Sequence, residues 1–151
     1  MKRFLLFVII IATGILNAQQ THVYFPDNVD APLTPQEKLK FEQVYGKDAT
    51  YVMEKPSLFK NLKDLVRNRV EVMEIPYEKA QGSKQLRNAK DLSTTELYNV
   101  YNPGLTHDMQ YSSQSFNVLK YAINFYPEKK EIYKIGNHYI TILPQAKKER
   151  K

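Results

Sequence analysis

Cysteine is absent from the 151 residues of this chain, and glycine is scarce, with five residues. Without cysteine the protein has no disulfide bonds and no thiolate ligands for a metal. It also lacks the cysteine that carries the lipid of a bacterial lipoprotein. The low glycine content excludes a collagen-like chain, and no heptad pattern persists to form a coiled coil.

The glycines after residue 18 each fall where a helix cap, loop or turn is expected. They are Gly46, Gly82, Gly104 and Gly136. None remains for a glycine-rich loop that binds phosphate, and the chain has no His-Glu-x-x-His or calcium-loop motif. We therefore expect no metal site and no cofactor.

The formal net charge of +6 comes mostly from the two ends of the chain. Lys2 and Arg3 lie at the N-terminus, and residues 147–151 form a basic tail. The remaining residues carry nearly equal numbers of basic and acidic side chains. Because a nucleic-acid site needs a basic patch or stripe, we expect no nucleic-acid partner.

Residues 1–18 have the organisation of a secretory signal peptide. Lys2 and Arg3 precede an apolar run over residues 4–16, and Ala18 suits the position before the cleavage site. The run is shorter than the roughly 20 residues of a membrane-spanning helix, so no span should remain after cleavage. The high share of Lys, Asn, Tyr and Ile is typical of an AT-rich bacterial genome. We expect an exported protein of the periplasm or outer-membrane periphery.

The length of the chain favours one domain. Residues 19–33 contain several Pro, Asp and Asn residues without a sustained period, which predicts an extended leader. We expect a single α+β domain over residues 34–146, followed by the basic tail over 147–151.

The clearest helix signal is the capping box Thr34–Glu37, with proline at the first helical position. It predicts a helix to about Tyr45, ended by Gly46 in a left-handed conformation. Residues 48–54 favour a short strand through Tyr51 and Met53.

A second helix should follow Pro56, with Ser57 as its cap. Its core-facing stripe would be formed by Leu58, Leu62, Leu65 and Val66. The period then changes to two, which predicts a strand over residues 69–75.

The middle of the chain is polar. Residues 77–90 predict a mobile loop, and residues 112–115 a further polar link. A second capping box, Ser93–Glu96, predicts a short helix through Leu97 and Val100 that the turn Asn102–Gly104 ends.

The last third alternates like an antiparallel sheet. Strands are expected over residues 119–125, 131–135 and 138–143, with Gly136 opening a two-residue hairpin turn. This hairpin places Ile135 opposite His138, Tyr133 opposite Ile140 and Glu131 opposite Ile142. A five-residue loop over 126–130 would then place Ile123 opposite Tyr133. The predicted fold is two or three helices followed by a three-stranded meander, to which the strand from Arg69 to Ile75 could be added.

Two sets of residues are candidates for function. His107 and Asp108 could orient an imidazole for base catalysis, but no nucleophile motif accompanies them. Tyr98, Tyr101 and Tyr111 cluster around the Asn102–Gly104 turn, and tyrosine is enriched at protein interfaces.

These features favour a non-enzymatic module that binds an envelope protein or outer-membrane component, as a small subunit of a larger assembly. A small exported hydrolase using His107 and Asp108 is the first alternative. A secreted inhibitor or toxin-like protein is the second. The oligomeric state is left open.

Overall fold

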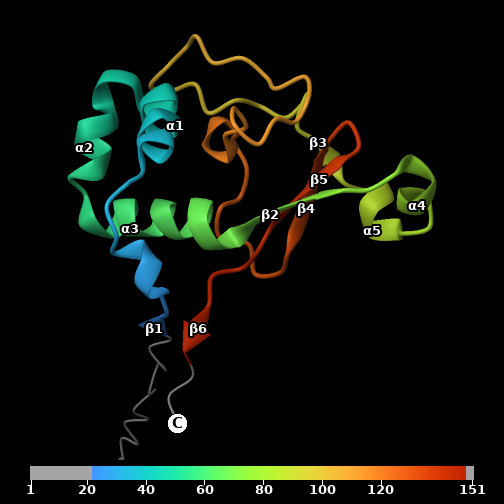
Figure 1. Ribbon diagram of the computed structural model, residues 1–151, viewed down its shortest axis with the longest axis horizontal. Coiled ribbons are helices and arrows are strands. Elements are labelled where there is room, and N and C mark those ends of the chain that lie inside the picture. Colours follow the sequence, from blue (N-terminus) through green and yellow to red (C-terminus); the bar gives the residue numbers. More distant parts are fainter. Residues whose placement is uncertain (1–21, 149–151) are drawn as a thin grey trace, which may run out of the picture.

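The computed structural model describes residues 22–148 and has an α+β fold (Figure 1). Helices α1 (Pro35–Tyr45), α2 (Ala49–Met53) and α3 (Pro56–Asp64) gather at one end of the molecule, and the sheet crosses its middle. The small helices α4 (Tyr77–Gln81) and α5 (Lys84–Arg87) lie at the other end. The predicted signal peptide over residues 1–18 lies outside the described residues. No helix within residues 22–148 is long and apolar enough to cross a membrane.

The first helix begins where the capping box predicts. In α1, Pro35–Tyr45, the Thr34 hydroxyl accepts from the backbone N–H of Glu37 at 3.2 Å, and the Glu37 carboxylate accepts from the Thr34 N–H at 2.7 Å. Gly46 follows at φ +54°, a conformation that favours glycine. The helix predicted from Thr34 to about Tyr45 is confirmed, and Gly46 has the positive φ but, at ψ −130°, not the left-handed helical conformation.

The strand expected over residues 48–54 is wrong, because helix α2 occupies Ala49–Met53. Ala49 and Val52 are buried three residues apart, which matches a helical period rather than a strand. Helix α3, Pro56–Asp64, is confirmed, but Ser57 is not its cap. Lys55 takes the cap position, and Pro56 begins the helix.

A π-helical turn, Leu65–Arg69, links α3 to strand β2, Val70–Glu74. Leu62 and Leu65 of the predicted apolar stripe are buried, whereas Leu58 is exposed. Strand β2 confirms the strand predicted over residues 69–75.

The main sheet has the order β2–β5–β4–β3, with β4 at Glu131–Ile135, β5 at His138–Ile142 and β3 at Lys90–Asp91. Strands β4 and β5 form the predicted hairpin, and all three predicted cross-strand pairs are confirmed. Strand β2 pairs antiparallel with β5, and β3 pairs parallel with β4.

The prediction of a third meander strand over residues 119–125 is wrong. Residues Val118–Lys120 form a 3-10 turn, and Tyr121 makes only an isolated bridge with Leu97. The Asn117 side chain accepts from the Leu119 N–H and donates to the Lys40 carbonyl of α1, which bends the chain away from the hairpin. The two outer edges of the hairpin are instead taken by β2 and β3. Ile123 therefore does not pair with Tyr133.

Two further predictions for the middle of the chain are wrong. The loop expected over residues 77–90 contains helices α4, Tyr77–Gln81, and α5, Lys84–Arg87. The helix expected after Ser93 does not form, because the Asp91 carboxylate accepts from both the N–H and the hydroxyl of Ser93 and holds a turn there. The turn at Asn102–Gly104 is present.

The two ends of the described chain lie side by side. Strand β1, His22–Val23, pairs antiparallel with β6, Lys147–Lys148 (Figure 1). The predicted leader thus contains a short strand, and it also contains a 3-10 turn, Asp27–Val29, whose Val29 is buried. Of the predicted basic tail, Lys147 and Lys148 belong to β6, and residues 149–151 lie outside the described part.

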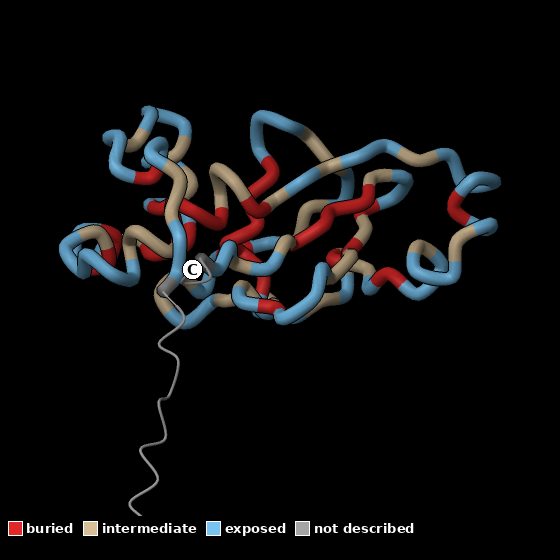
Figure 2. The backbone as a smooth tube through the Cα atoms, turned by 90° about the horizontal axis from the view of Figure 1, so that it is seen from below, coloured by how far each residue is buried: buried red, intermediate tan, exposed pale blue. Residues whose placement is uncertain are grey.

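The main core fills the space between α1–α3 and one face of the sheet, and Figure 2 shows the buried residues concentrated there. Its largest fully buried side chains include Phe41, Leu65, Leu92, Leu119, Tyr121, Ile135, Ile140 and Ile142. A smaller cluster of Ala80, Ala89 and Tyr139 packs α4 and α5 against the sheet.

Candidate functional site

The predicted pair His107 and Asp108 is not brought together as a catalytic dyad. The Nε2 atom of His107 lies 2.7 Å from the Thr95 carbonyl oxygen. The Asp108 carboxylate accepts from the Lys120 ammonium at 2.8 Å and from the Tyr121 hydroxyl at 2.7 Å. Each partner therefore has another task, and no hydrogen bond in the described chain joins the His107 ring to this carboxylate.

The Asp108 contacts are structural anchors. The Lys120 side chain is 4% exposed and Asp108 13% exposed, so water reaches little of this ion pair. Burial and the hydrogen bond to Asp108 raise the pKa of the Tyr121 hydroxyl, so this group stays protonated and donates even well above neutral pH. The pair holds the loop around residue 108 against the 3-10 turn at Lys120.

The three candidate tyrosines lie in two separate clusters. Tyr98 and Tyr101 pack around buried Tyr45, with ring centroids 6.4 and 5.5 Å from it. Tyr111 stacks on His138 of β5, with centroids 4.6 Å apart. All three are half-buried, so they attach the loops to the helices and to the hairpin with part of each ring in contact with solvent.

The tyrosines belong to a long irregular segment, residues 92–130, between β3 and β4. It is fastened to α1 by Asn102, which donates to the Gln43 carbonyl at 2.7 Å, and by Asn117, which donates to the Lys40 carbonyl at 2.8 Å. Backbone hydrogen bonds also join its two halves, from Tyr98 N–H to the Lys120 carbonyl and from Ala122 N–H to the Glu96 carbonyl. Residues 92–130 are therefore an ordered layer that buries Leu92, Leu119 and Tyr121 in the core and exposes its outer side chains to solvent.

Val100 and Met109 project from this layer. They are 73% and 77% exposed, the highest values among the large apolar side chains of the described residues. Sequence reasoning placed Val100 on a helix and did not single out Met109. A single exposed apolar residue is an ordinary feature of a protein surface. Val100 and Met109 are candidates for binding because the segment that carries them is held in place by hydrogen bonds.

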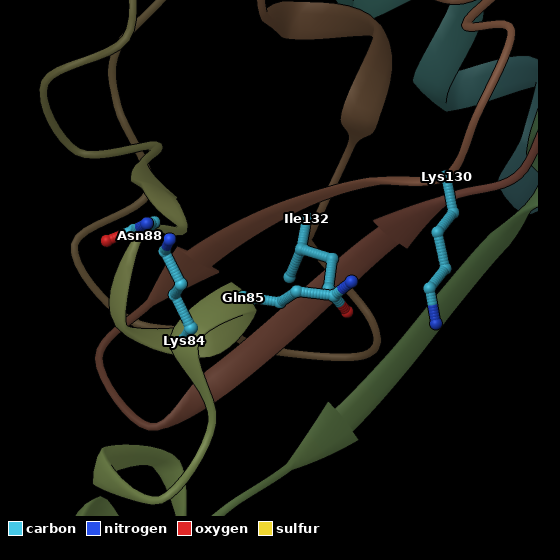
Figure 3. A pocket seen from close by; sticks show the side chains of 5 residues that line it. All are labelled: Lys84, Gln85, Asn88, Lys130 and Ile132. Carbon is cyan, nitrogen blue, oxygen red and sulfur yellow. The ribbon is translucent and has the colours of Figure 1, made fainter.

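A second feature that the sequence did not predict is an open groove of about 340 Å³ between α5 and β4. Figure 3 shows Gln85 reaching over Ile132, with Lys84 and Lys130 on opposite sides of the groove. The polar lining is completed by Asn88, and no carboxylate contributes to it. This groove could not be predicted from the sequence, because residues 84–88 were expected to be part of a loop.

A buried ion pair marks the end of α3. Arg69 Nε donates to Asp64 at 2.8 Å, and its Nη1 donates to the carbonyls of Phe125 and Leu143. The side chains of Arg69 and Asp64 are 4% and 3% exposed, and Arg69 Nη2 is buried without a partner among the described residues. This pair joins α3 to the ends of segment 92–130 and β5, which is a structural task.

Metal binding has no support within residues 22–148, where no group of three His, Asp or Glu side chains is arranged to hold an ion. Comparison of the chain with models of protein families, with curated proteins and with solved structures gives no match. The functional argument therefore depends on the geometry described above.

Proposed function

We propose that the protein is an exported bacterial envelope protein that acts as a non-enzymatic binding module. Its partner is a protein of the envelope, bound through residues 92–130. Export is argued from the signal-peptide pattern of residues 1–18. The single observation that carries the binding role is the anchored layer that exposes Val100 and Met109.

The layer suits a binding role because it is already ordered. Its hydrogen bonds to α1 and the buried pair of Lys120 and Asp108 fix the backbone in advance. A partner would then lose little conformational entropy on binding, which is the main benefit of a preorganised surface. Long connections without regular structure in compact domains are commonly functional.

The chemistry of the exposed side chains favours a protein partner. Burying a valine or methionine side chain is worth roughly 1.5–3 kcal/mol, and half-buried Tyr98, Tyr101 and Tyr111 add contact area with a polar hydroxyl. The nearly neutral body of the chain does not favour a nucleic acid.

The test is a pull-down from membrane and soluble fractions with the mature protein. The variant carrying Val100→Ser and Met109→Ser should lose the captured envelope protein, because both apolar contacts are removed. Tyr77→Ser is the matched control, since Tyr77 is 71% exposed on α4, outside the segment. Equal capture by the double variant and the control would refute the proposed surface.

A further inference from the structure

Strand β2 is an open edge of the main sheet. Its one strand partner in the described chain is β5, and no other strand pairs with its outer side. At the opposite edge, β3 is only two residues long. An edge of five residues with unpaired backbone groups is a template for another strand.

The hydrogen bonds at both ends of β2 show which of its residues bond to β5 and which face outward. The Leu143 N–H donates to the Arg69 carbonyl at 2.8 Å, and the Ile75 N–H donates to the Asn137 carbonyl at 2.9 Å. Hydrogen-bonded pairs alternate along an antiparallel ladder. The odd-numbered residues of β2 therefore bond to β5, and the N–H and carbonyl groups of Val70, Val72 and Glu74 point outward.

We propose that the β2 edge pairs antiparallel with β2 of a second copy of this chain. The pairing would centre on Val72 opposite its own counterpart, with Val70 opposite Glu74 and Glu71 opposite Met73. This register uses all three outward-facing residues of each strand. The two four-stranded sheets would become one continuous sheet, in a closed twofold dimer.

The charge pattern of β2 favours this register. Glu71 and Glu74 each lie opposite an apolar residue, so no carboxylates face each other directly. Shifting the pairing so that Glu71 opposes its own counterpart would place like charges opposite each other, which is unfavourable. The charge pattern therefore disfavours the register centred on Glu71. The register centred on Met73 also places no carboxylates opposite each other, but a charge introduced at position 73 would then face itself, so the Met73 variants separate it from the proposed register.

Met73 provides the sharpest test of that register. It is 50% exposed, so the monomer tolerates a charged residue there. Met73→Glu would create two carboxylate pairs across the dimer and should raise the dimer dissociation constant by about two- to thirty-fold. Met73→Lys would face Glu71 twice and should lower it by a similar factor. Tyr77→Glu and Tyr77→Lys make the same charge changes outside β2 and should have little effect.

The dissociation constants are measured by sedimentation of the mature protein up to about 1 mM. A wild-type chain that stays monomeric at that concentration overturns the proposal and leaves the edge open for a strand of another protein. Opposite shifts for Met73→Glu and Met73→Lys, absent at Tyr77, support it. Shifts of the same sign, or equal shifts at both positions, overturn the register.

A cross-link gives an independent reading, because the chain contains no cysteine. Directly opposite residues of a hydrogen-bonded pair have Cα atoms about 5.5 Å apart and Cβ atoms at a similar distance, which a short bifunctional thiol reagent spans. Val72→Cys should therefore be cross-linked into a covalent dimer by such a reagent without denaturant. Tyr77→Cys should form far less of it, and equal yields at the two positions would contradict the pairing.

Discussion

The contact of Glu37 with Arg67 predicts a strong dependence of stability on pH. The Arg67 guanidinium donates to both carboxylate oxygens of Glu37, at 2.6 and 2.8 Å, and the Thr34 N–H donates to the same group. The two side chains are only 18% and 10% exposed. Arg67 also donates to the carbonyls of Asn28, Ala31 and Pro32, so this contact joins the leader, α1 and the π-helical turn.

The size of the expected change in stability follows from the pKa of the Glu37 carboxyl group. The hydrogen bonds from Arg67 and from Thr34 outweigh the opposing effect of burial and lower the pKa of Glu37 from 4.5 to about 2. This difference corresponds to about 3 kcal/mol of folding free energy at pH 7. Because the folded-state pKa is the lower one, this stability is complete above pH 4.5 and is lost as the pH falls towards 2. At pH 3 about 1.5 kcal/mol should remain.

The perturbation is Glu37→Gln, which keeps the size of the side chain and removes its charge. Urea unfolding followed by circular dichroism should show a loss of about 3 kcal/mol at pH 7 and about half of that at pH 3. Glu42→Gln on the same helix is the control. Glu42 is 45% exposed and lies 3.7 Å from Lys38, so its loss should be under about 0.5 kcal/mol. A difference between Glu37→Gln and wild type that does not change with pH would refute the reasoning.

Three other predictions concern separate parts of the chain. Gly136→Ala should destabilise the protein by about 1 kcal/mol, because the φ angle of this residue is +57°. Gly82→Ala is the control and should be nearly neutral, since the φ angle of Gly82 is −69°. The midpoints of urea unfolding measure both effects. Asp108→Ala should cost about 3–5 kcal/mol, since it leaves buried Lys120 without its partner, and a smaller loss would show that water reaches the site. The intact mass of protein from the cell envelope should match a chain beginning at or near Gln19, and a chain that retains residues 4–16 would contradict export.

Helix α1 and the β4–β5 hairpin could be predicted because their signals are local. The capping box at Thr34 and Glu37 closes within one turn, and the Gly136 turn sets the register of the ten residues around it. The period of two in the residues after Arg69 was also enough to predict strand β2. Which strand would lie on the outer side of β4 depends on distant pairing, and the sequence alone favoured residues 119–125, whereas β3 lies there.

The candidate site was harder to predict because its contacts join residues far apart. Adjacent His107 and Asp108 invited a catalytic interpretation, yet Asp108 is held by Lys120 and Tyr121, twelve and thirteen positions further on. No periodic pattern in a sequence shows that a lysine such as Lys120 will be buried and paired with a carboxylate from another part of the chain. The exposed side chain of Met109 is likewise set by the anchors around it and has no signature of its own.

The two capping boxes show why a correct local signal can still fail. After Glu37 the chain has room for three helical turns, and α1 buries Phe41 and Val44 in the core. After Glu96 the turn at Asn102–Gly104 leaves room for little more than one turn, and starting a helix costs more than so few residues return. In addition, the Asp91 carboxylate accepts from the Ser93 hydroxyl that would have capped the helix. A motif for starting a helix is decisive only where the following residues can both continue the helix and bury one face of it.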